Sequence, residues 1–190
     1  GDTVQDSKEL AEQLGKAIAK SGHILTTGAT VGLPLFAARA AHKAGGMSIG
    51  FSPASSLQEH VYKYRLPIGM FDYINFTGLH YVGRDVYLVQ SSDAIITVGG
   101  RFGSLHEFTT ALESNMPCGI LVGSGGTADI IPELMDKLET PHRNLVIFDK
   151  DPQELVKKII AKLDEQLGGI DTTKIANQWF LDETAATRNG

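Results

Sequence analysis

The feature that most limits the fold is a regular alternation between short apolar runs and longer stretches with helical periodicity. Leu10, Leu14 and Ile18 recur at the spacing of one helix face, within a helix predicted over 7–20. The apolar run 94–98 is nearly unbroken, as is typical of a central strand covered on both faces. Strands that alternate with helices of this length form βαβ units with parallel strands. The sequence therefore predicts an α/β protein with a Rossmann-like, doubly wound, mostly parallel sheet flanked by helices.

The same patterns predict the remaining elements. Further strands are expected at 23–27, 47–51, 71–76, 119–123 and 145–148. Further helices are expected at 33–44, 82–91, 105–112, 129–138 and 152–166. The last of these follows Asp151 and Pro152, which resemble the start of a capping box. Residues 54–68 carry no clear period and are interpreted as a loop or lid.

A length of 190 residues favours one domain with an appendage. We expect the domain over 1–167 and a polar tail or arm over 168–190. Doubly wound folds normally open with a strand, whereas this sequence opens with the helix over 7–20. We therefore expect a first strand of the sheet ahead of residue 1, beside the strand 23–27.

Composition and charge exclude several classes of protein. A net charge of −5 and the lack of any basic run disfavour a nucleic-acid binder. No apolar run approaches the ~18 residues of a membrane span, and no signal-peptide pattern is present. A single cysteine, Cys118, cannot form an internal disulfide, so a cytoplasmic protein is expected. The six histidines show no metal-ligand spacing, and no metal site is predicted.

The segment that best indicates chemistry follows the strand 94–98 and opens a helix. It contains Gly99, Gly100, Arg101, Phe102, Gly103 and Ser104. Glycines let the backbone approach an anion, and the positive end of a helix attracts it, so a phosphate suits this loop. The spacing Ser104-x-x-Glu107 also matches a capping box that merely completes the helix. On spacing alone we favour the capping interpretation for Glu107 and the binding interpretation for the glycines.

Two other features belong with this loop. The turn over Gly28, Ala29, Thr30 and Gly32 lies between a strand and a helix, and neighbouring strand ends would bring both segments to one crevice. Arg84 falls close to the start of a predicted helix, where the macrodipole disfavours a cation. A solvent-exposed arginine is the simpler interpretation, but the position hints at a compensating anion or carboxylate.

In combination these segments resemble the LONELY GUY (LOG) family, once labelled "possible lysine decarboxylases". The run 99–107 resembles the family's P-G-G-Y-G-T-x-x-E signature, and the run 28–33 resembles its G-G-S-V-G-L turn. Arg84 precedes Glu107 at a spacing similar to that of the family's catalytic arginine and glutamate. The resemblance covers roughly residues 5–160.

The resemblance implies hydrolysis of the N-glycosidic bond of a nucleoside 5′-monophosphate, which releases free base and ribose 5-phosphate. Arg84 and Glu107 would be the catalytic pair, with the loop 99–104 on the 5′-phosphate and the turn 28–32 lining the same crevice. Loss of the base builds positive charge on the ribose, which a carboxylate can stabilise. The resemblance implies no cofactor, a nucleotide or other phosphorylated small molecule as partner, and a homodimer or homotetramer.

Departures from the signature keep a second function open. Gly99 replaces its proline, Arg101 its second glycine, Phe102 its tyrosine and Ser104 its threonine. Arg101 either adds a phosphate contact or blocks the pocket. The run 82–85 looks more like a sister branch, which includes molybdenum-cofactor carrier proteins and uncharacterised nucleotide-binding proteins. A non-catalytic carrier or sensor is therefore the alternative, and a nucleotide-regulated assembly protein is a third.

Overall fold

The computed structural model describes residues 2–168 and contains alternating helices and parallel strands. The strands are β1 (Leu25–Thr27), β2 (Ser48–Ser52), β3 (Tyr73–Phe76), β4 (Ile95–Val98), β5 (Cys118–Leu121) and β6 (Val146–Asp149). The α-helices are α1 (Asp2–Lys20), α2 (Leu33–Lys43), α3 (His80–Gln90), α4 (Phe102–Glu113), α5 (Gly126–Lys137) and α6 (Pro152–Leu167). The predicted α/β class and the predicted order of elements are confirmed. The predicted tail 168–190 lies almost entirely outside the described residues.

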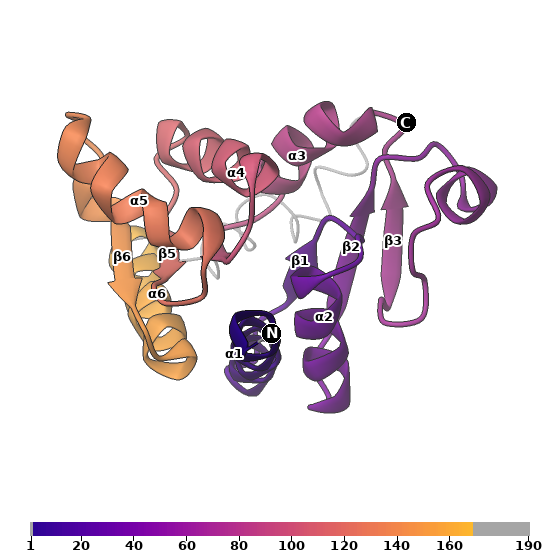
Figure 1. Cartoon of the computed structure of the whole chain (residues 1–190), viewed down its shortest axis with the longest axis horizontal. Helices are drawn as coiled ribbons and strands as arrows, with labels where there is room; N and C mark the ends of the chain where they lie inside the picture. The colour runs from indigo at the N-terminus through magenta and orange to yellow at the C-terminus, as the bar shows by residue number, and fades with distance from the viewer. Residues whose placement is uncertain (1, 169–190) are drawn as a thin grey trace, which may run out of the picture.

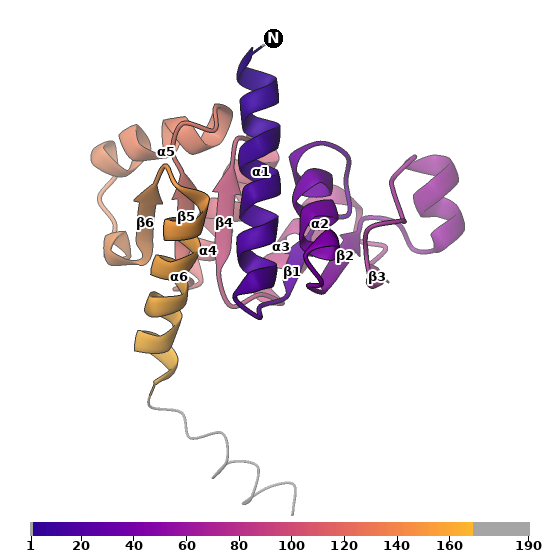
Figure 2. The same ribbon diagram turned by 90° about the horizontal axis from the view of Figure 1, so that it is seen from below.

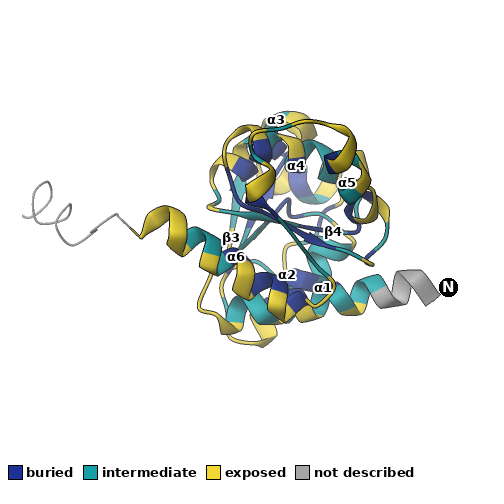
Figure 3. Cartoon of the chain, turned by 90° about the vertical axis from the view of Figure 1, so that its left-hand side faces the viewer, coloured by how far each residue is buried: buried dark blue, intermediate teal, exposed yellow. Residues whose placement is uncertain are grey.

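The strands lie between two layers of helices. Helices α1, α2 and α6 cover one face, and α3, α4 and α5 cover the other (Figures 1 and 3). The buried faces of the helices point toward the strands, and the exposed faces point outward (Figure 3). This is the arrangement expected of a Rossmann-like sandwich.

The strands form two parallel three-stranded sheets rather than one continuous sheet. The orders are β1-β2-β3 and β4-β5-β6. Leu25 pairs with Ser48 in the first sheet, and Ile95 pairs with Cys118 in the second. Within the described residues, β1 and β4 have no strand partner on their facing edges, and α1 crosses the space between them (Figure 2). The expectation of a further strand ahead of residue 1, beside the strand 23–27, stays a prediction.

Strand β4 is less covered than its apolar sequence predicts. Ile95, Ile96 and Val98 are only half-buried, whereas every residue of β5 is buried. The reason is the unpaired edge of β4, which faces a cavity. The main core lies one strand further along, where Phe108, Ile120 and Ile131 pack between β5, α4 and α5.

Local signals explain how several elements begin. The Asp151 carboxylate accepts hydrogen bonds from the backbone N–H groups of Gln153 and Glu154, which confirms the predicted start of α6 at Pro152. At α4 the capping prediction is wrong. The N-cap residue is Arg101 and makes no side-chain cap, while Ser104 already lies inside the helix.

The predicted loop 54–68 contains one helical turn, a π-helix over Glu59–Lys63. The side chain of His60 holds this turn in place. Its ring is fully buried, with Nδ1 hydrogen-bonded to Ser52 Oγ (2.7 Å) and Nε2 to the Pro67 carbonyl (3.0 Å). The described segment of the chain has no helix long and apolar enough to cross a membrane. It also holds no group of three or more His, Cys, Asp or Glu side chains able to bind a metal ion.

Candidate functional site

A large cavity of about 1070 Å³ opens at the carboxyl ends of β1 and β4. Both glycine segments reach it, through Gly28, Thr30 and Gly32 on one side and Gly100, Arg101, Gly103 and Ser104 on the other. Arg84 from α3 and Glu107 from α4 line the same cavity. Ligands of open α/β sheets bind at this edge, where the strand order changes direction.

The loop between β4 and α4 requires its first two glycines. Gly99 and Gly100 have φ values of 55° and 93°, which other residues rarely adopt. A Cβ atom at Gly100 would also lie 2.2 Å from Ser104 Oγ. The carbonyls of Gly99 and Gly100 accept hydrogen bonds from the N–H groups of Ala128 and Thr127 at the start of α5. Helix α5 therefore holds this loop in place.

The N-terminus of α4 faces the cavity without a side-chain cap. The helical ladder begins with the bond from Leu105 N–H to the Arg101 carbonyl. The N–H groups of Gly103 and Ser104 precede it and have no partner in the described part of the chain. Free N–H donors and the positive end of the helix dipole make this a suitable place for a phosphate.

Arg84 is buried at the floor of the cavity, with only 4% of its surface exposed. Its Nη1 donates a hydrogen bond of 3.1 Å to the Phe51 carbonyl at the end of β2. Its Nε lies 3.1 Å from Asp85 Oδ1 but is not aligned for a hydrogen bond, so this buried N–H has no partner among the described residues. Arg84 was expected to have a compensating anion or carboxylate nearby. That carboxylate belongs to Asp85, the next residue in the sequence.

Asp85 links Arg84 to the helix that carries Glu107. Its second oxygen, Oδ2, lies 3.4 Å from His106 Nδ1 on α4. Asp85 is itself buried. The three side chains form a chain of alternating charge across α3 and α4 when His106 is protonated.

Glu107 is the titratable group whose pKa matters most for chemistry at this site. Burial and the nearby negative charge of Asp85 raise the pKa of Glu107 to about 7, although Arg84 and His106 act in the opposite direction. The carboxyl group makes no hydrogen bond or ion pair with the described residues. Near neutral pH it therefore exists in both protonation states, as suits proton transfer.

The structure brings most of the predicted site residues to the cavity. Those on its wall are Gly28, Thr30, Gly32, Arg84, Gly100, Arg101, Gly103, Ser104 and Glu107. Three others lie elsewhere. Ala29 is fully buried beneath the turn, Gly99 binds Ser124 Oγ behind the loop (2.7 Å), and Phe102 points outward with 88% of its surface exposed.

Asp85 and His106 are not among the site residues predicted from the sequence. Their contact joins α3 to α4 through two residues that are 21 positions apart in the sequence. The available signal was the unfavourable position of Arg84 near the start of α3, which called for a nearby carboxylate.

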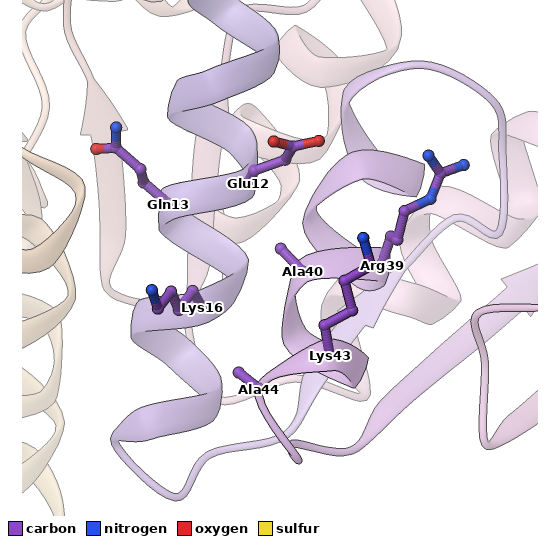
Figure 4. Close-up of a pocket in the computed structure, with 7 residues that line it drawn as sticks. All are labelled: Glu12, Gln13, Lys16, Arg39, Ala40, Lys43 and Ala44. Carbon is purple, nitrogen blue, oxygen red and sulfur yellow. The ribbon is translucent and has the colours of Figure 1, made fainter.

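A second depression, of about 350 Å³, lies between α1 and α2 on the outer surface (Figure 4). Lys16, Arg39 and Lys43 line it together with Glu12. Neither glycine segment lines it, and neither Arg84 nor Glu107 does. The cavity beside β1 and β4 is therefore the candidate site.

Several solved structures resemble this chain in fold. The crystal structure of TM1055 superposes with a TM-score of 0.72 over 83% of this chain and 89% of that one, and its 23% identity shows a shared fold. The molybdenum cofactor binding protein from Rippkaea orientalis is 31% identical, with a TM-score of 0.67 over 81% of this chain and 88% of that one. The molybdenum cofactor carrier protein from Chlamydomonas reinhardtii is 28% identical, with a TM-score of 0.63 over 82% and 89%.

The family assignment rests on most of the chain. The model of the SLOG cluster4 family matches residues 1–156, a range that contains both glycine segments, Arg84 and Glu107. This finding confirms the resemblance to LOG-like proteins and to the branch of the molybdenum-cofactor carriers. The chain belongs to the SLOG cluster4 family.

Proposed function

We propose that the protein hydrolyses the N-glycosidic bond of a nucleoside 5′-monophosphate, with Glu107 as the acid–base residue. The observation that carries this proposal is the position of Glu107. It does not cap α4. Its carboxyl has a pKa of about 7, has no hydrogen-bond or ion-pair partner among the described residues, and lies on the same cavity as Arg84 and the open N-terminus of α4.

We assign some groups in the cavity to binding the phosphate and others to the reacting end of the substrate. The N–H groups of Gly103 and Ser104 would bind the 5′-phosphate, and Arg101 stands at the same helix end as a further cation. Arg84, whose guanidinium keeps one buried N–H free, would orient the reacting carboxyl or a substrate oxygen.

The reaction requires one bond to break and one to form at the ribose C1′. The C1′–N bond breaks, its electron pair goes to the base, and the protonated Glu107 carboxyl gives that nitrogen its proton. Water then adds to C1′ and loses a proton to the Glu107 carboxylate, which restores the acid. A carboxyl with a pKa near 7 serves both steps at neutral pH.

Release of free base from AMP, GMP, CMP, UMP and an N6-prenylated AMP, followed by chromatography, tests the proposal. We expect base release from at least one of them. Glu107→Gln should reduce it by ~10²–10⁴-fold, as is usual for loss of an acid–base group. Arg84→Ala should also abolish it, whereas Glu113→Gln, at an exposed position of the same helix, should not change it. Base release that survives in Glu107→Gln would contradict the assignment.

The pH profile gives a second test of Glu107. Asp85 contributes to the raised pKa of Glu107, so Asp85→Asn should lower that pKa and move the profile of base release toward acid pH. Asp164→Asn, at an exposed position on α6, is the matched control. A profile that stays in place or moves toward alkaline pH in Asp85→Asn would show that another group sets it.

The second candidate function is a non-catalytic carrier or sensor of a phosphorylated ligand. Similarity to two proteins described as binding or carrying the molybdenum cofactor favours it, at 31% and 28% identity. Nucleotide binding by calorimetry without any base release would support the carrier and reject the hydrolase.

A further inference from the structure

The start of α3 places an aromatic side chain on the wall of the cavity, and the reaction proposed above gives it no role. Tyr81 is the second residue of α3 and lines the cavity together with Arg84. The two residues are three positions apart, so they lie on the same face of the helix. Arg84 is buried at the floor of the cavity, whereas 47% of the surface of Tyr81 is exposed. Tyr81 therefore lies nearer to the opening of the cavity than Arg84 does.

A second tyrosine contacts the ring of Tyr81. Tyr64 directly follows the π-helix Glu59–Lys63, and its ring meets that of Tyr81 at an angle of 82°, with 5.6 Å between the ring centroids. This edge-to-face geometry is a favourable one for a pair of aromatic rings. Tyr64 is not among the residues that line the cavity, so its contact acts on the position of Tyr81 and not directly on a ligand.

The backbone at the start of α3 belongs to the same arrangement. His80 has a φ of 55°, which is uncommon for a residue with a side chain. Its N–H donates a hydrogen bond of 3.1 Å to the Pro53 carbonyl, and its Nδ1 is hydrogen-bonded to the Tyr64 hydroxyl at 2.8 Å. Contacts on both sides of His80 thus hold the start of α3, and Tyr81 with it, against the segment 54–68.

The other neighbour of the Tyr81 ring is a cation. Arg84 Cζ lies 5.8 Å from the centroid of this ring, within the range of a cation–π interaction. Tyr64 and Arg84 hold the ring but leave nearly half of the side chain uncovered. A ring that is held in advance loses little conformational entropy when a ligand covers it. Such a ring on a cavity wall is suited to stacking against a flat ring of the ligand.

The position of Tyr81 matches the part of a nucleotide that no other group has been assigned to. Helices α3 and α4 lie side by side over one face of the strands (Figure 1). The start of α4 is assigned to the phosphate, and Arg84 and Glu107 are assigned to the bond that breaks. The base is attached at that bond, and Tyr81 lies directly beside Arg84. The base is therefore the part of the ligand that Tyr81 is placed to contact.

We propose that Tyr81 binds the base of the ligand by aromatic stacking, and that Tyr64 is the positioning residue that holds its ring. The inference rests on the nucleotide ligand of the proposed function but not on hydrolysis of that ligand, since a carrier of the same ligand would use the same contact. Tyr81 is then the residue that distinguishes a ligand with a base from a sugar phosphate.

Calorimetric titration with AMP and with ribose 5-phosphate tests the proposal. Every variant also carries Glu107→Gln, so that AMP is not consumed. We expect Tyr81→Ala to lower the affinity for AMP by ~10–100-fold, as is usual for loss of a stacked aromatic ring. The affinity for ribose 5-phosphate should not change, because this ligand has no base. Tyr81→Phe should keep both affinities, and Tyr73→Ala, exposed on β3 and away from the cavity, is the matched control.

The role of Tyr64 is tested with the same two ligands. Tyr64→Leu removes the edge-to-face contact, and we expect it to lower the affinity for AMP by ~2–10-fold. The affinity for ribose 5-phosphate should again stay unchanged, which a general loss of structure would not produce. Tyr64→Phe keeps the ring and should have a smaller effect. Tyr62→Ala, at an exposed position of the same π-helix, is the matched control.

The outcomes separate this proposal from the proposed hydrolysis. Equal loss of affinity for both ligands in Tyr81→Ala would overturn it, because the ring would then only hold Arg84 in place. An unchanged affinity for AMP in Tyr81→Ala would overturn it as well. AMP binding that depends on Tyr81, without base release in the chain that keeps Glu107, would support the stacking and reject the hydrolase. Base release that Tyr81→Ala leaves unchanged would reject the stacking alone, and binding of neither ligand would overturn both.

Discussion

Gly28 determines where the Arg84 guanidinium can lie. A Cβ atom at Gly28 would lie 1.8 Å from Arg84 Nη1, the nitrogen that donates to the Phe51 carbonyl. The turn 28–32 therefore serves the site in two ways, as a wall of the cavity and as the space for a buried cation. Both roles need a residue without a side chain at this position.

This contact predicts the result of replacing Gly28 with alanine. The clash involves the far end of a side chain, so we expect Gly28→Ala to displace the guanidinium with a modest loss of stability. Nucleotide affinity or base release should fall, as measured by calorimetry and chromatography. Gly69→Ala is the control, since a Cβ atom there meets nothing within 4 Å. Unchanged ligand affinity and activity in Gly28→Ala would show that Arg84 does not need this position.

The raised pKa of Glu107 predicts a pH-dependent effect on stability. The ordinary pKa of a glutamate side chain is 4.5 and the pKa of Glu107 in the folded protein is about 7, so the folded state binds more protons than the unfolded state between these limits. Stability from this group is complete below pH 4.5 and falls as the pH rises through about 7. The glutamine side chain of Glu107→Gln does not ionise, so this variant does not lose stability in this way as the pH rises.

We therefore expect Glu107→Gln to be more stable than the parent chain at pH 8, by about 1–3 kcal/mol. The two should approach equal stability near pH 4.5, measured as free energies of unfolding in urea. Glu113→Gln, which is exposed on the same helix, should show no such trend. A destabilised Glu107→Gln at pH 8 would mean that the carboxylate has favourable contacts in the folded state.

At the scale of elements, α1 and α2 approach closely enough to exclude a methyl group. A Cβ atom at Gly15 on α1 would lie 2.0 Å from the Ala37 carbonyl oxygen on α2. Here the obstacle is backbone, which cannot move aside without separating the helices. This contact fixes the position of α1 against α2.

Helix propensity and packing make opposite predictions for Gly15→Ala. Propensity alone would stabilise the helix by about 1 kcal/mol. Packing should dominate, and we expect a net loss of about 1–3 kcal/mol in the free energy of unfolding. Lys16→Ala, at the exposed neighbouring position, should change stability little. A stabilised Gly15→Ala would show that the two helices are packed more loosely than the structure indicates.

The start of α4 shows how an element boundary changes a functional interpretation. Ser104-x-x-Glu107 has capping-box spacing, which would start the helix at Leu105, but the helix begins three residues earlier, at Phe102. Glu107 then lies beyond the first turn, where no free backbone N–H needs a cap. Glu107 lines the cavity instead.

At the scale of the whole molecule, the outer surface near the site carries exposed apolar side chains. Val82 on α3 is 69% exposed, Tyr87 on the same helix 45%, and Phe102 at the start of α4 88%. Large exposed apolar groups of this kind are typical of interaction surfaces. The homo-oligomer that the family resemblance implies stays a prediction.

We expect sedimentation to give a mass above that of one 20.4 kDa chain. Val82→Glu should shift the distribution toward the single chain, since a charge is costly within an apolar interface. Lys43→Glu, on the opposite layer of helices, is the control. A mass near 20.4 kDa for the parent chain would contradict the oligomer.

The sequence by itself determined the α/β class, the order of the elements, the start of α6 at Asp151 and the two glycine segments of the cavity. These follow from periodicity and from backbone preferences that act within a few residues. Only the tertiary structure decided that Glu107 lies in a cavity, that Asp85 joins Arg84 to His106, and that β1 and β4 stand apart. Those features depend on contacts between segments distant in the chain, and no local pattern of residues encodes such a contact.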